Sequence, residues 1–283
     1  MAVDTACLSD WVGRTRVAKD VVSPSDTHRL AACLDRAMPP QQGSELPACW
    51  HWVLFQPTDR QSEIGSDGHP KAGDFLPPVP LPRRMFVGIT IDTAKPLRVG
   101  DTVTRVSKIA SIAPKEGKQG LLVFVTMQHE LTSSSGGSLV EEHRMVFRDN
   151  PKPGAKLQQD AGQPPSAAWQ TPFHFDPVVV FRFCAATFNA HRIHYDEHYA
   201  RDIEGYPNLV VPGRLAALML LEALRAQDDR AVAHFSFRAE RPIWVGDRAL
   251  GCGRLNADGE AALWVTGPSG HVAMTASARF EPR

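Results

Sequence analysis

Apolar and polar residues alternate in several stretches of the chain, which is the pattern of β-strands that bury one face of a sheet. In the last stretch Val272, Met274, Ala276, Ala278 and Phe280 would lie on one face, with Ala273, Thr275, Ser277 and Arg279 on the other. Similar runs cover residues 121–131, 139–147 and 261–265. Together these runs predict an antiparallel sheet with one buried side.

A segment in each half of the chain repeats the same pattern. Residues 89–101 and 235–247 both begin with alternating apolar positions and end in Pro-x-x-Val-Gly-Asp, at an offset of 146 residues. Further strand-like runs follow each copy in the same order. We therefore predict a duplicated α+β unit, with one copy in residues 1–150, a second in residues 166–283, and a linker over residues 150–165.

Residues 213–225 predict a helix that is apolar on nearly every face. Gly213 opens this helix, and only Arg214, Glu222 and Arg225 within it are charged. A helix of this composition must be enclosed by other structure. We therefore expect the sheet of the second unit to curve around it.

The first unit carries a helix that we interpret as the equivalent one, over Ser25–Met38. Ser23 or Ser25 would cap its N-terminus, and the two prolines that follow it would end it. Residues 56–82 are rich in glycine, proline and charge, so they predict a long surface loop inserted in this unit.

Composition narrows the class of protein. The 283 residues include 43% hydrophobic ones, enough for a full core, and the 31 basic and 31 acidic side chains cancel, so nothing indicates a nucleic-acid or membrane partner. Five scattered cysteines without Cys-x-x-Cys spacing argue against a disulfide framework or a zinc knuckle and favour a reducing cytoplasm. No apolar run precedes Trp11, so we expect neither a signal peptide nor a spanning helix.

Residues 188–197 hold the densest chemistry in the chain. They contain two imidazoles, an amide, a phenol and two carboxylates, flanked by apolar sequence. Gly213 follows shortly downstream, and the free N–H groups at a helix start can hold an anion. This combination suggests a reaction that moves water while an oxyanion forms on a carbonyl, as in thioester or acyl chemistry.

Two motifs carry a resemblance to a known family. Residues 73–85 (Gly-Asp-Phe-Leu-Pro-Pro-Val-Pro-Leu-Pro-Arg-Arg-Met) and 188–196 (Phe-Asn-Ala-His-Arg-Ile-His-Tyr-Asp) look like the MaoC-like enoyl-thioester hydratases in their double hotdog form. The resemblance covers the whole chain. It is strongest to the branch of itaconyl-CoA hydratases, mesaconyl-C4-CoA (3-methylfumaryl-CoA) hydratases and the mitochondrial 3-hydroxyacyl-thioester dehydratase. It implies two antiparallel sheets that each wrap a central helix, a CoA thioester substrate, and no metal or cofactor.

The resemblance also implies roles for individual residues. The common family motif, Gly-Asp-x-Asn-Pro-Ile-His, holds the reacting water with its Asp and His, and His194 matches that His. Asn189 takes the place of the Asp or, with one inserted residue, of the motif's Asn; either way no carboxylate is present and the base must be an imidazole. The N–H groups near Gly213 would hold the thioester oxygen, although glycine there also suits close helix–sheet packing.

Other candidate residues keep two interpretations. His191 is either a second catalyst or a residue that orients one, and Asp196 either supports the site or caps a short helix that follows it. Arg83 and Arg84 would hold coenzyme A phosphates or lie solvated at a loop end. Arg192 would pair with a substrate carboxylate or point outward.

We expect a hydro-lyase whose second unit carries the chemistry and whose first unit shapes the pocket. Its expected substrate is a short branched dicarboxylic enoyl-CoA, with itaconyl-CoA or mesaconyl-C4-CoA converted to citramalyl-CoA in itaconate degradation. The alternatives are a 3-hydroxyacyl-thioester dehydratase of fatty acyl chains and a non-catalytic acyl-CoA-binding module, which should lack the Asn189 and His194 constellation. His191 and His194, with Asp196 or His198, could be metal ligands, but a metal is disfavoured because structural zinc usually brings cysteines and catalytic zinc usually needs a third well-spaced ligand. Paired sheet edges would give a homodimer or higher homo-oligomer.

Overall fold

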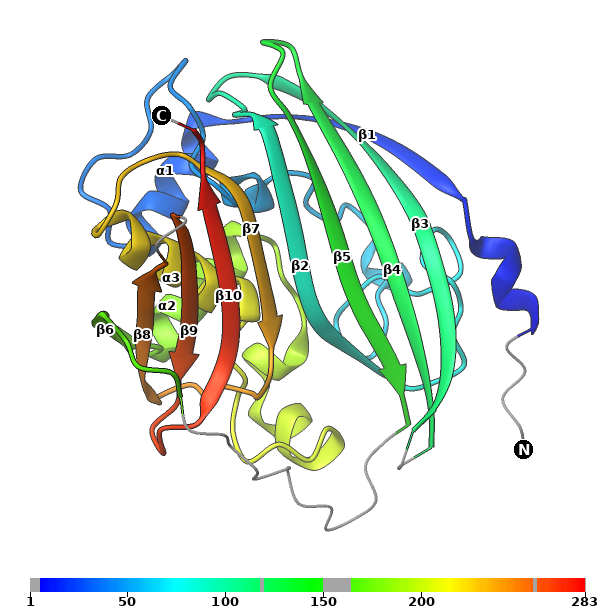
Figure 1. Ribbon diagram of the computed structural model, residues 1–283. Coiled ribbons are helices and arrows are strands. Elements are labelled where there is room, and N and C mark those ends of the chain that lie inside the picture. Colours follow the sequence, from blue (N-terminus) through cyan, green and yellow to red (C-terminus); the bar gives the residue numbers. More distant parts are fainter. Residues whose placement is uncertain (1–5, 118–119, 150–163, 257–258, 283) are drawn as a thin grey trace.

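A curved antiparallel sheet organises the molecule (Figure 1). The computed structural model describes residues 6–117, 120–149, 164–256 and 259–282. Within them ten strands form one sheet in the order β1-β3-β4-β5-β2-β7-β10-β9-β8-β6. The strands are β1 (Thr15–Val21), β2 (Arg83–Lys95), β3 (Thr102–Gly117), β4 (Gly120–Ser133), β5 (Ser138–Arg148), β6 (Trp169–His174), β7 (Val232–Ala239), β8 (Arg248–Leu255), β9 (Glu260–Thr266) and β10 (Val272–Phe280).

Each half of the chain contributes five neighbouring strands in the same order. Read from the outer edge inward, β1-β3-β4-β5-β2 in the first half corresponds to β6-β8-β9-β10-β7 in the second. The halves meet where residues 88–92 of β2 pair with residues 234–238 of β7. The predicted duplication is thus confirmed in the topology, but the two expected sheets are joined into one. Most of the predicted linker, residues 150–163, lies outside the described residues.

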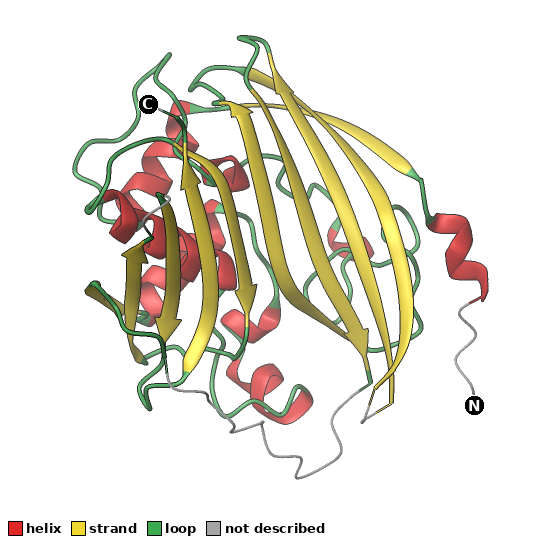
Figure 2. Cartoon of the chain, viewed as in Figure 1, coloured by secondary structure: helices red, strands yellow, loops and turns green. Residues whose placement is uncertain are grey.

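The helix α3 (Gly213–Arg225) begins and ends where the sequence predicts. It packs against β8 and β9, and its buried side chains belong to the main hydrophobic core. Figure 2 shows this helix behind the second-half strands, together with α1 (Pro24–Cys33) and α2 (Pro177–Ala186). The buried residues of α3 are Leu215, Ala216, Ala217, Leu218, Leu220, Leu221, Ala223 and Leu224.

The first-half helix differs from the prediction in both length and counterpart. α1 runs over Pro24–Cys33 and is capped by Ser23. It ends well before Met38, and Asp35 two residues beyond it adopts a left-handed backbone (φ 55°). In the chain α1 follows β1 as α2 (Pro177–Ala186) follows β6, so the topological equivalent of α1 is α2 rather than α3.

No helix of the length of α3 stands between α1 and β2 in the described residues. That interval holds only the short 3-10 helices η2 (Trp50–Val53) and η3 (Gln61–Glu63), joined by loops. Figure 1 shows α1, α2 and α3 grouped behind the second-half strands. The inner face of β3, β4 and β5 therefore lacks a covering central helix, and this difference between the halves leaves room for a cavity.

The helix α2 was not predicted, because the three consecutive valines near its start favour a strand. Its start signals are nevertheless present in the sequence. The carboxylate of Asp176 accepts hydrogen bonds from the N–H groups of Val178 (2.7 Å) and Val179 (2.9 Å), and Pro177 occupies the first helical position. The other helical turns are η1 (Ala6–Trp11), η4 (Arg192–His194) and the π-helical η5 (Tyr199–Ile203).

The alternation predicted for β10 is confirmed over most of the strand. Met274 and Ala278 are buried, and Thr275 and Arg279 are exposed. Ala273 departs from the pattern because the pairing with β9 shifts between Val272 and Met274. As a result the adjacent side chains of Ala273 and Met274 are both buried.

Candidate active site

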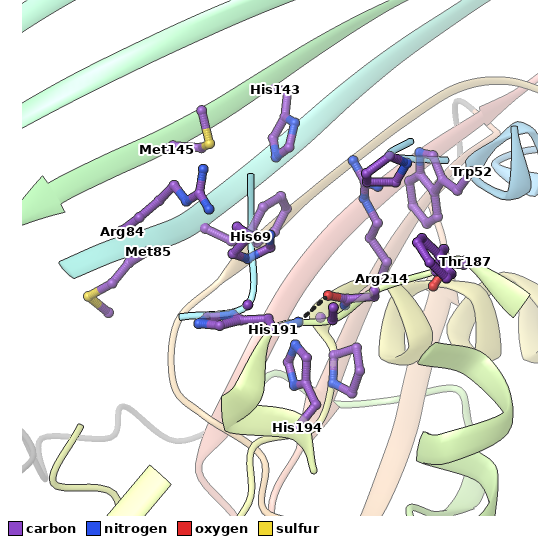
Figure 3. Close-up of a pocket in the computed structure, with 18 of the residues that line it drawn as sticks. Trp52, His69, Arg84, Met85, His143, Met145, Thr187, His191, His194 and Arg214 are labelled. Atoms are coloured by element: carbon purple, nitrogen blue, oxygen red, sulfur yellow. Dashed lines mark hydrogen bonds between the residues drawn. The ribbon is translucent and has the colours of Figure 1, made fainter. Parts of the chain in front are cut away.

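A cavity of about 650 Å³ lies on the inner face of the first-half strands. Its walls come from both halves of the chain: strands β2 to β5, the loop before β2, the segment that ends in η4, and the start of α3. Figure 3 shows His143 and Met145 of β5 on one side of this space and His191 and His194 on the other. The fold thus brings together residues that are far apart in the sequence.

The eight residues predicted for the site divide into two groups. Five line the cavity, namely Arg84, Asn189, His191, His194 and Gly213. Three are absent from its lining, namely Arg83, Arg192 and Asp196.

His194 is held as a neutral imidazole with one free ring nitrogen. It ends η4, it is buried, and its Nδ1 lies 2.7 Å from the carbonyl oxygen of Val210. A carbonyl only accepts hydrogen bonds, so Nδ1 carries the hydrogen and Nε2 keeps its lone pair. Burial lowers the pKa of His194 to about 4, and the bond to Val210 opposes this only in part. A lone pair is therefore available at neutral pH.

Val210 makes a second contact with the same segment. Its N–H donates to the carbonyl oxygen of Ile193 at 2.9 Å. Two hydrogen bonds, one from the backbone and one from the His194 ring, therefore tie the η4 segment to the residues that lead into α3.

Asn189 and His191 stand beside His194. The side-chain oxygen of Asn189 accepts the backbone N–H of His191 at 3.2 Å, drawn as a dashed line in Figure 3, and this leaves the amide NH₂ as a donor. The His191 ring meets that of His194 edge-on at a centroid distance of 5.4 Å. Burial, reinforced by the charges of His69 and His194, lowers the pKa of His191 to about 2. His191 is therefore neutral at neutral pH.

Gly213 supplies the free end of a helix. Neither its N–H nor that of Arg214 donates to any acceptor within the described part of the chain. A Cβ at Gly213 would meet only the Phe86 ring, at 3.7 Å, which is an ordinary van der Waals distance. The packing explanation for this glycine is therefore not supported. The two N–H groups remain as unused donors at the positive end of a helix dipole.

The loop before β2 enters the site, although its composition predicted a surface loop. Gly68, with φ +90°, approaches the backbone so closely that a Cβ would lie 1.8 Å from the Ala190 carbonyl oxygen. The N–H of Arg192 donates to the carbonyl oxygen of Asp67 at 2.9 Å. This docking brings the His69 ring to a centroid distance of 4.6 Å from His191. Burial first, and then the positive charge of Arg84, lower the pKa of His69 well below its ordinary value.

Three predicted side chains are occupied elsewhere. Arg83 is buried, its Nε lies 2.8 Å from a carboxylate oxygen of Glu204, and it is therefore not available to a coenzyme A phosphate. The guanidinium of Arg192 donates to Asp196 at 2.7 and 2.9 Å, so it is not available to a substrate carboxylate. Asp196 also accepts the N–H of Tyr199 (3.0 Å), which supports the cap interpretation. These placements argue against the ligand-binding roles considered for Arg83 and Arg192, and they favour the cap among the two interpretations of Asp196.

Arg84 remains in the cavity. Its guanidinium lies 3.3 Å from Asp67, and Figure 3 shows it on the same side as Met145 and His143. Burial lowers its pKa, against the opposing charge of Asp67. An arginine charge therefore borders the cavity even though its neighbour Arg83 points elsewhere.

Polar side chains on the first-half strands, centred on Glu141, form one wall of the cavity that we did not predict from the sequence. We call it the polar wall. Glu141 accepts hydrogen bonds from Trp52 (2.8 Å) and from His51 (2.9 Å), and Arg214 lies 3.8 Å from its other oxygen. Burial alone would raise the pKa of Glu141, but the bond and charge of His51 and the charge of Arg214 hold it well below its ordinary value. A signal existed: on β5, Glu141 and His143 occupy the face that the alternation assigns to apolar residues.

Two groups of side chains in the described residues bring imidazole and carboxylate atoms within 4.8 Å of one another. Such donors suit zinc or iron. In both groups the carboxylate already accepts other donors, so an ion would have to compete with them. The groups are Asp67 with His69 and His191, and Glu141 with His129 and His143.

Comparison with known proteins identifies the family of the chain. The family model for hydroxyacyl-thioester dehydratase type 2 matches residues 49–245. The chain belongs to this family. Mesaconyl-C(4)-CoA hydratase of Chloroflexus aurantiacus is 38% identical over 276 residues, covering 94% of this chain and 95% of that protein. The mitochondrial hydroxyacyl-thioester dehydratase type 2 of Schizosaccharomyces pombe is 25% identical over 263 residues, covering 81% and 86%.

Similar solved structures confirm the fold. A MaoC-like dehydratase from Phytophthora capsici superposes with a TM-score of 0.70 at 14% identity, over 95% of each chain. A Mycobacterium tuberculosis protein described as a double hotdog gives 0.56 at 12% identity, over 94% of this chain and 95% of that one. The family member described here is thus an α+β double hotdog and an enzyme of the hydro-lyase type. None of its described helices is both long and apolar enough to span a bilayer.

Proposed function

We propose that this enzyme hydrates a short, branched, dicarboxylic enoyl-CoA, with mesaconyl-C4-CoA giving citramalyl-CoA as the reaction. The observation that carries the proposal is the pairing of His194, with Nε2 free, and the unused N–H groups at Gly213, both bordering one cavity. The 38% identity to a mesaconyl-C(4)-CoA hydratase supports the substrate class.

In the proposed mechanism the base and the helix start act on opposite ends of the conjugated system. His194 Nε2 removes a proton from water, and the oxygen of that water bonds to the β-carbon of the substrate. The electrons of the double bond move toward the thioester, whose oxygen becomes negative. The N–H groups of Gly213 and Arg214 hold this oxygen, and one such donor is worth about 3 to 4 kcal/mol in the transition state.

The same imidazole completes the reaction. His194, now protonated, returns its proton to the α-carbon, and the carbonyl of the thioester re-forms. The amide NH₂ of Asn189 donates to the water oxygen and positions it, and His191 orients the neighbouring ring. Neutral His191 does not repel the imidazolium that forms on His194, because its lowered pKa keeps it uncharged.

The runner-up is dehydration of a 3-hydroxyacyl thioester with a fatty chain, supported by the family model and the 25% identical relative. The chemistry is the same reaction run in reverse. The polar wall around Glu141 favours the dicarboxylic substrate, because a long alkyl chain against it would strip water from charged groups without replacing their hydrogen bonds.

Several broader proposals accompany this one. We place the acid–base chemistry in the second unit, residues 166–283, and substrate shaping in the first unit, residues 1–150. The enzyme would act in the cytoplasm as a homodimer or larger homo-oligomer. Itaconyl-CoA, whose double bond is not conjugated to its thioester, would enter only after isomerisation to the mesaconyl form, which would connect the enzyme to itaconate degradation.

The test is hydration of mesaconyl-C4-CoA by the purified full-length enzyme in deuterium oxide. We expect loss of the conjugated thioester absorbance, a product heavier by one water, and one deuterium placed stereospecifically at the α-carbon. Activity should persist after treatment with a chelator. Faster turnover of straight long-chain enoyl-CoA than of mesaconyl-C4-CoA would overturn the substrate proposal and leave the dehydratase alternative.

A further inference from the structure

The polar wall of the cavity contains two guanidinium groups whose hydrogen-bonding capacity is largely unused. Arg214 reaches into the cavity from the first turn of α3, and Arg105 reaches into it from β3. Figure 3 shows the Arg214 side chain extending from the helix start toward Trp52. The reaction proposed above uses neither guanidinium.

Arg214 is held in place without a direct hydrogen bond. Its guanidinium lies 5.3 Å from the Trp52 ring centroid and 3.8 Å from the nearest oxygen of Glu141, and it makes no hydrogen bond to any described residue. Glu141 is itself fixed by Trp52 and His51. Glu141 and Trp52 therefore fix the direction of the Arg214 side chain and leave its N–H donors free.

Arg105 adds a second unsatisfied donor. Its Nε is buried without a hydrogen-bond partner, and its guanidinium stacks on the Phe55 ring at 4.3 Å. A buried donor left unpaired costs free energy, so a site that retains one is expected to pair it when a ligand is bound.

The local charge favours an anion. Arg105, Arg214 and Arg16 carry three positive charges against the two negative charges of Glu141 and Asp20, which leaves an excess of one positive charge. The neighbouring imidazoles of His129 and His143 do not add to it, because burial lowers their pKa values to about 4 and about 3. They can instead accept or donate single hydrogen bonds as neutral groups.

We propose that Arg214, assisted by Arg105, binds the free carboxylate of the acyl group. The inference rests on the proposed hydration of a dicarboxylic thioester. In mesaconyl-C4-CoA the carboxylate carbon lies roughly 4 Å from the thioester carbonyl carbon. Arg214 directly follows the glycine whose N–H would hold the thioester oxygen, so its side chain starts beside that end of the substrate and extends along the cavity. A planar guanidinium also matches a carboxylate in shape and charge.

Arg214 would thus replace Arg192 as the partner of the carboxylate. Arg192 is closed off by Asp196, with two hydrogen bonds below 3 Å, whereas the nearest carboxylate to Arg214 lies beyond hydrogen-bonding distance. Glu141 then acts as a positioning residue for Arg214 and does not touch the substrate.

The first arm of the test measures selectivity. Arg214→Met keeps the backbone N–H and suits a helix, and mesaconyl-C4-CoA is compared with 3-methylcrotonyl-CoA, in which a methyl group replaces the carboxylate. We expect kcat/KM for the dicarboxylic substrate to fall about 10- to 100-fold, with that for the neutral one changing by less than about threefold. Arg238→Met, on an exposed part of β7, is the matched control and should change neither.

The second arm does not depend on hydration. Succinyl-CoA and butyryl-CoA are saturated, and they differ by carboxylate against methyl. The wild type should bind succinyl-CoA about 10- to 100-fold more tightly by calorimetry, and Arg214→Met should abolish the difference. Equal affinities in the wild type, or a difference that survives in the variant, would overturn the subsite. Intact binding selectivity without hydration of mesaconyl-C4-CoA would instead overturn the proposed function.

Discussion

His194 can serve as a base because its Nδ1–H donates to a backbone carbonyl oxygen, which can only accept, so that Nε2 keeps its lone pair. The bond from Nδ1 to Val210 fixes one tautomer, and burial keeps the ring neutral. Replacing His194 by Ala should therefore lower kcat by about two to four orders of magnitude. Steady-state kinetics with circular dichroism as a folding control would test this. More than a tenth of wild-type turnover would exclude the role.

The lowered pKa of His194 predicts how kcat/KM depends on pH. The ring loses its lone pair only below its pKa of about 4, whereas an ordinary histidine would do so near 6.5. The kcat/KM profile should therefore stay level through mildly acidic conditions and decline toward about pH 4. Enzyme returned to neutral pH before assay controls for unfolding. An acid limb centred near the ordinary histidine value would contradict a buried base.

Some residues of the candidate site could be predicted from the sequence, and others could not. Asn189, His191 and His194 were recognisable because they lie within six residues of one another, and the chain carries them into the cavity together. His69 and Glu141 come from distant segments, and only the tertiary fold brings them to the same space. The pairing of Arg192 with Asp196 likewise depends on side-chain geometry, which spacing alone does not fix.

At the scale of elements, α3 was predictable because an apolar helix bounded by proline–glycine leaves few alternatives. The helix α2 was not, since its valines and its Asp-Pro start signal point in opposite directions. The loop before β2 is largely exposed, as its composition predicts, but part of it also lines the cavity. A residue that faces a cavity looks the same in sequence as one that faces solvent, so this second role could not be predicted.

The start of α3 can be tested with a pair of variants. Gly213→Pro removes one N–H, while proline is favoured at the first position of a helix, so α3 should persist. We expect kcat to fall by about two to three orders of magnitude. Gly213→Ala retains the N–H and places its Cβ at an ordinary contact distance from Phe86, so it should retain most activity. Equal losses in the two variants would show that the N–H is not the important group.

The docked loop offers a second matched pair. Gly68→Ala combines a left-handed backbone with a collision against Ala190, whereas Gly73→Ala has a left-handed backbone and open space. We expect the first to lower the free energy of unfolding by about 1 to 3 kcal/mol and to reduce kcat/KM, because His69 would be displaced. Urea unfolding and kinetics would measure both. Similar behaviour of the two variants would mean that the close approach to Ala190 is unimportant.

At the scale of the whole molecule, duplication was visible in the sequence but its asymmetry was not. The repeated Pro-x-x-Val-Gly-Asp turns mark equivalent strands in both halves. Among its described residues the first half has no helix as long as α3, and the cavity lies in the resulting space. The missing counterpart of α3 leaves no motif in the sequence, so the position of the cavity could be found only from the structure.

The cavity also makes the whole molecule sensitive to acid. The pKa values of His69, His129, His143, His191 and His194 are all lowered in the folded state. Unfolding restores values near 6.5, so the unfolded chain binds more protons below that pH and stability is lost as pH falls from there. Each imidazole contributes a slope of up to about 1.4 kcal/mol per pH unit, less where the ring is partly exposed in the cavity.

Urea unfolding measured from about pH 7 down to about pH 5 should show a falling midpoint. His143→Met should make that fall shallower, by about one proton, while leaving the stability at neutral pH close to that of the wild type. A midpoint that does not change over this range would contradict the uncharged state of these rings.

Val210 has a consequence for how precisely the reacting groups are spaced. It joins Ile193 through its N–H and His194 through its carbonyl, and it stands three residues before Gly213. The proposed base and the proposed oxyanion-binding helix start are therefore attached to one short piece of backbone. We expect their separation to vary less than the distance of either from the far wall of the cavity. The first-half side of the cavity could thus accommodate substrates of different shape without a change in the distance between His194 and the start of α3.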